Sequence, residues 1–271
     1  MAALLAGCVG VAYGQTDSWT GGGSDTNWTT NANWGNGVPP TSSDYVVLGY
    51  VNPTNAITLN TSPSVYGIAY QNSGGAGLSY AVTASGSQTI SIGAAGLYMA
   101  VSPAPSGPHS LTINNVNFTL AASQTWTIYP TSGVFTPSNT LSINGGTINL
   151  NGNNLTLGLS SNAQDTITIA APISGSGTVI YQGGAGGSNG ITIGGGTSTY
   201  TGTTTLNQIG NLVIIGDTPF GASSVQDAGS IVFSNSTLSN DFTMTSSSSA
   251  FYYNTPAATL TLNGTVTYST S

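Results

Sequence analysis

The sequence predicts an all-β protein, a right-handed parallel β-helix (β-solenoid) that is a fragment of a longer protein. Short runs in which apolar residues alternate with Thr or Ser recur along most of the 271 residues, and a period of two is typical of strands. Thr, Ser and Asn fill 101 positions, whereas Glu, Lys and Arg, the usual exposed helix formers, are absent. Short strands with tight Asn-Gly and Gly-rich corners favour stacked coils. A hairpin-built sandwich or barrel is the alternative.

The charge composition excludes several classes of function. Charged residues make up 3% of the chain, and the formal net charge is −7 without a single Lys or Arg. A chain without cations cannot neutralise phosphates, so we expect no nucleic-acid partner, no nucleotide and no attraction to anionic membranes. Catalysis by Lys, Arg or Glu is excluded, and we expect no cofactor.

Residues 1–14 are small and apolar and are interpreted as the tail of a signal peptide. Ala12-Tyr13-Gly14 offers a small-x-small cleavage site, and Leu5-Ala6-Gly7-Cys8 also fits a lipoprotein box in which Cys8 would be lipidated. The run is too short to span a bilayer. Both interpretations predict an exported protein.

The rest of the chain divides into two parts. Residues 15–44 contain three of the four Trp and are predicted to form an N-terminal cap, and residues 45–271 are predicted to form the β-helix. Runs such as 110–114 (SLTIN), 140–144 (TLSIN) and 166–169 (TITI) place Thr or Ser on one face and Leu or Ile on the other.

Residues 194–233 resemble the passenger-associated (autotransporter-associated β-strand) repeat of autotransporter-type surface proteins. The segment GGGTSTYTGTTTLNQIGNLVIIG is followed by DTPFG and GSIVF, which match the next coil of that repeat. Ser198 stands where the repeat usually has Asn, and Gln208-Ile209 adds a residue. The positions that carry the motif are Thr199, Tyr200, Thr201, Gly202, Thr204, Thr205, Gly210 and Leu212.

This resemblance implies an exported β-helical passenger, at the cell surface in association with the outer membrane or extracellular. It also implies a C-terminal translocator barrel, expected outside this fragment. The function expected is an adhesin-like presentation rod without catalysis, with host or environmental surface glycans or proteins as partners.

The N-terminal aromatic residues support an alternative function. Trp19, Trp28, Trp34 and Tyr45 lie within 27 residues, and exposed rings of this kind can stack on sugars in a carbohydrate-binding module. The competing interpretation is that the rings cover the open end of the first coil, whose core has no neighbour.

A polysaccharide-degrading β-helix enzyme is the second alternative, because glycosidases use paired carboxylates. Asp217 and Asp241 are about one coil apart and are the best candidates, although Asp217 also suits a turn. One His is too few for an ordinary zinc site, and His109 is interpreted as a loop residue. The Thr run at 197–205 could form a flat threonine array of the kind that binds ice. Such arrays repeat on every coil, whereas this run occurs only once, so we expect no ice binding from it.

Overall fold

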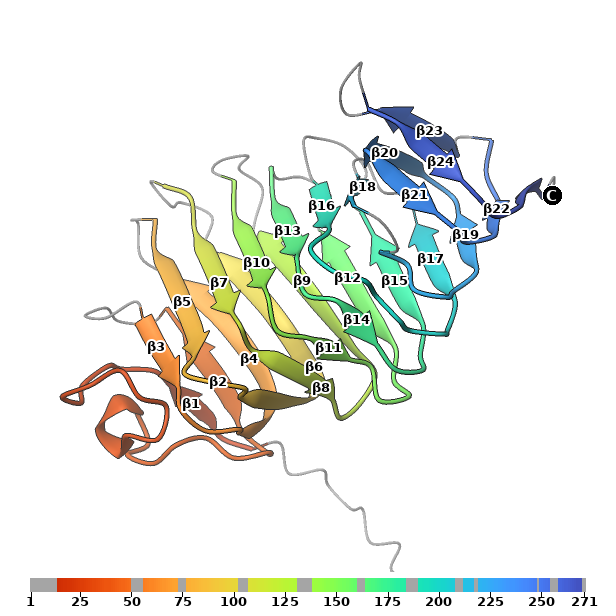
Figure 1. The fold of residues 1–271 in the computed structure, drawn as a ribbon. Helices are drawn as coiled ribbons and strands as arrows, with labels where there is room; N and C mark the ends of the chain where they lie inside the picture. Colours follow the sequence, from red (N-terminus) through yellow and green to blue (C-terminus); the bar gives the residue numbers. More distant parts are fainter. Residues whose placement is uncertain are drawn as a thin grey trace, which may run out of the picture.

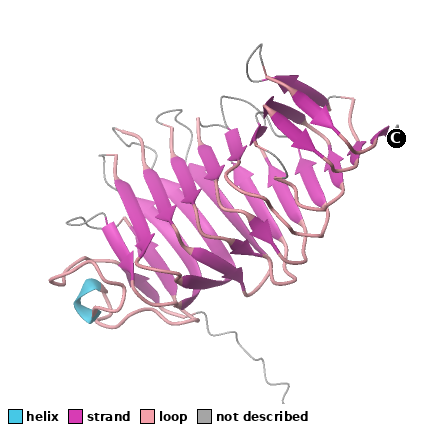
Figure 2. Ribbon diagram, in the orientation of Figure 1, coloured by secondary structure: helices cyan, strands magenta, loops and turns pink. Residues whose placement is uncertain are grey.

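The computed structural model describes residues 14–49, 56–72, 77–101, 107–130, 138–159, 164–183, 190–207, 212–216, 219–247, 249–253 and 258–269. In these residues the chain winds as a parallel β-helix, and Figure 1 shows the coils stacked from the N-terminal to the C-terminal end. The predicted all-β parallel β-helix is confirmed. Figure 2 shows strands throughout, with one short 3-10 helix, η1 (Asn31–Asn33).

The first and larger sheet has 14 strands. Its main path follows the chain from one end of the stack to the other: β1 (Thr16–Ser18), β2 (Tyr45–Leu48), β4 (Ser64–Asn72), β6 (Thr89–Val101), β9 (Gln124–Pro130), β12 (Leu155–Leu159), β15 (Val179–Gln182), β17 (Thr204–Asn207), β19 (Val225–Asp227), β22 (Phe242–Met244) and β25 (Val266–Tyr268). Three short strands of this sheet lie off the main path: β8 (Asn117–Leu120), β11 (Ile148–Asn149) and β14 (Ile173–Ser174). β8 pairs with β6 and with β11, and β11 pairs with β14.

The second sheet has nine strands and faces the viewer in Figure 1. Its strands are β3 (Ala56–Leu59), β5 (Ser79–Ala84), β7 (Ser110–Asn114), β10 (Thr140–Asn144), β13 (Thr166–Ile169), β16 (Gly190–Ile193), β18 (Leu212–Ile215), β20 (Ser230–Ser234) and β23 (Ala250–Tyr253). A two-stranded sheet of β21 (Ser236–Leu238) and β24 (Leu260–Leu262) completes the later coils.

The core is a narrow stack of like residues. Leu111, Leu141 and Ile167 are register partners on successive strands, and each is fully buried. Coil length varies more than the strands do: register partners are 31 residues apart between Gln124 and Leu155, but 17 apart between Val225 and Phe242. The strands therefore stay in register from coil to coil, and the difference in coil length lies in the connections between them.

The corners need backbone conformations with positive φ. Asn115 (φ 56°) and Asn151 (φ 51°) adopt the left-handed region that Asn tolerates better than most residues. Gly146 (φ 69°) is required for a second reason, since a Cβ there would lie 2.0 Å from the Val116 carbonyl oxygen of the neighbouring coil. The Asn and Gly corner signals of the sequence thus have a direct steric cause.

Candidate functional site

Trp19, Trp28 and Trp34 lie inside the N-terminal end of the stack, between 1 and 3% exposed. Trp34 is at the centre, with its ring centroid 5.1 Å from that of Trp19 and 4.8 Å from that of Trp28, both edge to face. Its Nε1 donates to the Trp28 carbonyl oxygen at 2.6 Å. No ring face is left for a sugar, so the glycan-stacking interpretation is wrong for these three residues and the cap interpretation describes them.

Asn33 holds the cap loop together from a fully buried position. Its side-chain amide donates to the carbonyl oxygens of Asp25 and Asn27, and its Oδ1 accepts the Gly23 N–H at 2.8 Å. A buried amide that satisfies several backbone groups fixes a loop that is otherwise tied to its neighbours by the isolated bridges Trp19–Trp34 and Asn27–Thr58.

Tyr45 lies outside the cap and forms part of a different cluster. It sits at the start of β2, half-buried on the outer face of the larger sheet. Its ring packs edge to face against Tyr66 at 5.2 Å and Tyr98 at 6.2 Å, from β4 and β6. We call Tyr45, Tyr66 and Tyr98 the tyrosine strip.

Small residues lie beside the tyrosine strip, and the carboxylate of Asp44 directly precedes Tyr45. Gly67 pairs in register with Tyr45 on one side and with Gly96 on the other. The two positions that follow Tyr45 across the sheet are therefore glycines without side chains. Gln71 donates its Nε2 proton to the Tyr98 hydroxyl oxygen at 2.7 Å, which leaves the phenolic proton of Tyr98 to be donated elsewhere. The strip can thus offer aromatic surface together with oriented polar groups.

The repeat motif forms a buried chain of hydroxyl groups. The Tyr200 hydroxyl lies 2.5 Å from Thr204 Oγ1, which lies 2.6 Å from Ser223 Oγ, and Ser223 donates to the Phe220 carbonyl oxygen at 2.7 Å. Since Ser223 donates its own proton, Thr204 donates to Ser223 and Tyr200 donates to Thr204. Burial raises the pKa of Tyr200 to about 12.

The remaining described motif positions also have structural roles. Thr199 and Thr201 donate their N–H groups to the previous coil, Thr205 points outward, and Leu212 is buried. A Cβ on Gly202 would lie 1.8 Å from the Gly177 carbonyl oxygen. Ser198 Oγ accepts the Ile173 N–H at 3.1 Å, which gives this departure from the repeat a structural role. Gly210 and Gln208-Ile209 lie outside the described residues.

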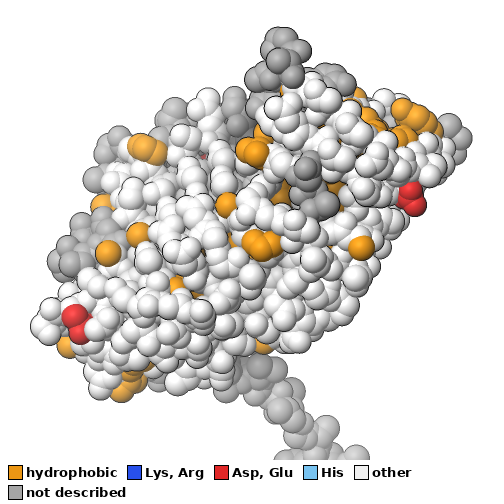
Figure 3. Space-filling model, viewed as in Figure 1, with side chains coloured by type: hydrophobic (Ala, Val, Ile, Leu, Met, Phe, Trp, Pro, Cys, Tyr) orange, Lys and Arg blue, Asp and Glu red, His pale blue; other side chains and the backbone are white. Residues whose placement is uncertain are grey.

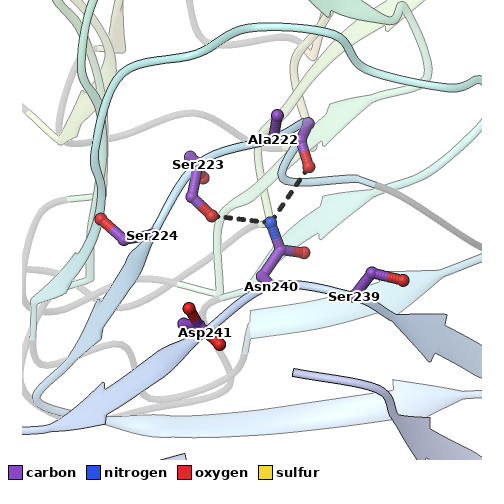
Figure 4. A pocket seen from close by; sticks show the side chains of 7 residues that line it. Ala222, Ser223, Ser224, Ser239, Asn240 and Asp241 are labelled. Atoms are coloured by element: carbon purple, nitrogen blue, oxygen red, sulfur yellow. Dashed lines mark hydrogen bonds between the residues drawn. The ribbon is translucent and has the colours of Figure 1, made fainter. Parts of the chain in front are cut away.

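The proposed carboxylate pair is not brought together in the described part of the chain, because Asp217 lies outside it. Asp241 is exposed, and its Oδ1 accepts the Thr265 N–H at 2.7 Å. It borders an open polar cavity of about 470 Å³ (Figure 4), where Asn240 Nδ2 donates to the carbonyl oxygens of Gly221 and Ser223. The cavity is lined by Gly221, Ala222, Ser223, Ser224, Ser239, Asn240 and Asp241.

All six described aspartates accept a backbone N–H group. The donors are Asn36 to Asp17, Asn27 to Asp25, Gln15 and Thr41 to Asp44, Asn139 to Asp165, Gly229 to Asp227 and Thr265 to Asp241. No group of three or more His, Cys or acidic residues that could hold a metal ion occurs among the described residues.

His109 lies in the loop directly before β7, as expected from the sequence, and its side chain is buried there. It is 1% exposed, and its Nδ1 accepts the Leu78 N–H at 3.2 Å and lies 2.8 Å from the Tyr70 hydroxyl. Burial lowers the pKa of His109. The backbone N–H of His109 donates to Asn139 Oδ1 at 3.4 Å, and the side-chain amide of Asn139 in turn donates to Asp165 Oδ1. The residues before β7, β10 and β13 therefore form a buried polar ladder.

Comparison of the chain with protein-family models, curated proteins and solved structures finds no match in any of the three. Within the described ranges, no helix is long and apolar enough to cross a membrane. Of the predicted signal-peptide segment 1–14, residues 1–13, which include Cys8, lie outside the described residues.

Proposed function

We propose that this chain is an exported, non-catalytic surface protein whose β-helix presents contact surfaces for adhesion. One observation carries the proposal: the described chain is a continuous stack of coils with outward-facing side chains that are nearly all uncharged. The carboxylates of Asp165 and Asp241 support it, since each accepts a backbone N–H group from a neighbouring coil and so joins segments of the stack. The resemblance of residues 194–233 to the passenger-associated repeat supports export to the cell surface.

The test combines binding and turnover. The purified chain is incubated with a panel of insoluble neutral polysaccharides and immobilised extracellular proteins, and both retention and soluble products are measured. Retention without product release is expected. Product release that is lost in Asp241→Asn would overturn the non-catalytic assignment. Surface exposure is tested by proteinase K digestion of intact cells that express the natural gene, because a chain without Lys or Arg has no trypsin sites.

A second candidate function is the binding of neutral glycans by the tyrosine strip. The observation that favours it is the packing of three half-buried tyrosines, one of them bonded to Gln71, on an outer sheet face. Aromatic rings with a polar edge suit surfaces that are apolar on one side and wet on the other. This candidate keeps the carbohydrate interpretation of Tyr45 and replaces its tryptophan partners by Tyr66 and Tyr98.

The matched control for the strip is on the other sheet. Tyr252 is 54% exposed on β23 and lies far along the stack from the strip. Tyr98→Ala is expected to reduce retention on polysaccharide, and Tyr252→Ala is expected to leave it unchanged. Equal losses in both variants would indicate non-specific aromatic adsorption and remove the strip from consideration.

A further inference from the structure

A second surface on the nine-stranded sheet is built from regularly repeated hydroxyl groups. The outward residues of β5, β7, β10, β13 and β16 stack in two adjacent rows, which we call the hydroxyl grid. The rows are Ser79–Ser110–Thr140–Thr166–Gly190 and Ala81–Thr112–Ser142–Thr168–Thr192. Eight of these ten positions are Ser or Thr.

The geometry of the grid follows from the strands that carry it. The five strands pair in unbroken register, so each row repeats at ~4.8 Å, and the rows lie roughly 6.6 Å apart because alternate residues of a strand share a face. None of the ten residues is buried. Thr has a restricted χ1 angle, which limits the positions of its hydroxyl. The result is a two-dimensional lattice of hydroxyl groups on a rigid support.

The grid has clear limits on this molecule. Beyond β16 its second row continues with Val213 and Val232, so the hydroxyl groups end there. On the larger sheet, the comparable row that contains Thr156 and Thr205 is interrupted by Ile180 and Gln226. Figure 3, which views the nine-stranded sheet, shows an uncharged surface over β7, β10 and β13, with acidic groups only near the two ends.

We propose that the hydroxyl grid binds the surface of ice. A hydroxyl group both donates and accepts hydrogen bonds, so a fixed lattice of them fits a partner that is itself a neutral lattice of donors and acceptors. Water molecules in ice meet this requirement. The grid is preorganised by the sheet, so little conformational entropy is lost when it is covered.

The composition of the grid argues against other occupants. It has no aromatic ring to place against a sugar and no charge to attract a lipid headgroup. A second copy of the chain would gain little, because hydroxyl faces bury little apolar area. The Thr run at 197–205 is not part of the grid, which comes from strands whose Thr and Ser are separated by buried residues.

The experiment uses the purified chain and a growing ice crystal. Retention in the ice fraction, crystal shaping and thermal hysteresis are measured for the wild type, for Ser142→Tyr at the centre of the grid, and for Thr156→Tyr on the opposite sheet. Both substitutions place a large ring at a half-buried, outward strand position. The wild type and Thr156→Tyr are expected to bind ice and shape crystals, whereas Ser142→Tyr is expected to lose both activities.

Two results would overturn the proposal: exclusion of the wild type from ice, or undiminished ice binding by Ser142→Tyr. Far-UV circular dichroism checks that the variants fold. If Ser142→Tyr does not fold, Thr168→Val serves instead, because it removes one hydroxyl from the grid and keeps the shape of the side chain. The inference does not rest on either proposed function, since it is argued from the hydroxyl grid alone and the tyrosine strip lies on the other sheet.

Discussion

Replacement of Asp227 by Asn should remove a large pH-dependent contribution to the stability of the β-helix. Asp227 is fully buried on β19, in a row between Leu206 and Met244. Its Oδ1 accepts the Gly229 N–H at 2.8 Å, whereas Oδ2 is buried without a hydrogen-bond partner. A carboxylate in this position is costly, and a neutral carboxyl group is far less so.

The direction and size of the effect follow from the pKa. Burial, opposed by the bond from Gly229, raises the pKa of Asp227 from 3.8 to about 6. Because the folded pKa is the higher one, the protonated group contributes its full stability below the unfolded value and loses it as the pH rises through about 6. A shift of about 2 units corresponds to at most about 3 kcal/mol between the two limits.

The assay is urea unfolding followed by far-UV circular dichroism at about pH 3 and about pH 8, on either side of the two pKa values. The cost of a buried amide is the same at both values, so the change in the variant-minus-wild-type difference isolates the titration. That difference should move in favour of Asp227→Asn by up to about 3 kcal/mol at the higher pH. Asp241→Asn is the control for a surface carboxylate. A difference for Asp227→Asn that is equal at both pH values would refute the reasoning.

Three further predictions concern the cap, the repeat and the polar ladder. Trp34→Ala should destabilise the N-terminal coil by about 3–5 kcal/mol, seen as faster hydrogen exchange in β2, whereas a Trp that only bound ligand would leave exchange unchanged. Tyr200→Phe should cost about 1–3 kcal/mol in urea unfolding because Thr204 loses its donor, and Tyr98→Phe should cost less. Since burial lowers the folded pKa of His109, its contribution to stability should be lost as the pH falls from the ordinary histidine pKa of 6.5 towards the folded pKa. His109→Gln should flatten that part of the stability profile.

The sequence alone predicts which side chains point inward, because a strand has a period of two and the core requires one apolar face. Leu111, Ile113, Leu141 and Ile143 all occupy the predicted side and are fully buried. The corner signals were equally informative, since positive φ at Asn151 and Gly146 leaves few residues to choose from. Burial of the cap tryptophans follows from the open end of the first coil, which would otherwise expose its core.

The sequence does not predict which residues of neighbouring coils are register partners, because coil length varies with the length of the corners. Without this pairing, Tyr66 and Tyr98 could not be placed beside Tyr45, nor could separate Ser and Thr runs be recognised as one grid. The same gap hid the neighbours of His109, since Asn139 lies 30 residues away along the chain and one coil away in space. Only the alignment of the coils brings such residues together.

Low charge affects the inside and the outside of this molecule differently. Outside, stacking identical coils places like residues at ~4.8 Å, where like charges would repel and hydroxyl groups do not. Inside, the few carboxylates have no cation to pair with, so Asp165 and Asp227 rely on N–H donors, and burial raises the pKa of each. Acidification therefore neutralises the buried carboxylates, which favours the fold, and protonates the buried His109, which opposes it. The pH dependence of the fold is consequently set by a few buried groups, and the outer faces, where we place both contact surfaces, can remain almost unchanged across the same range.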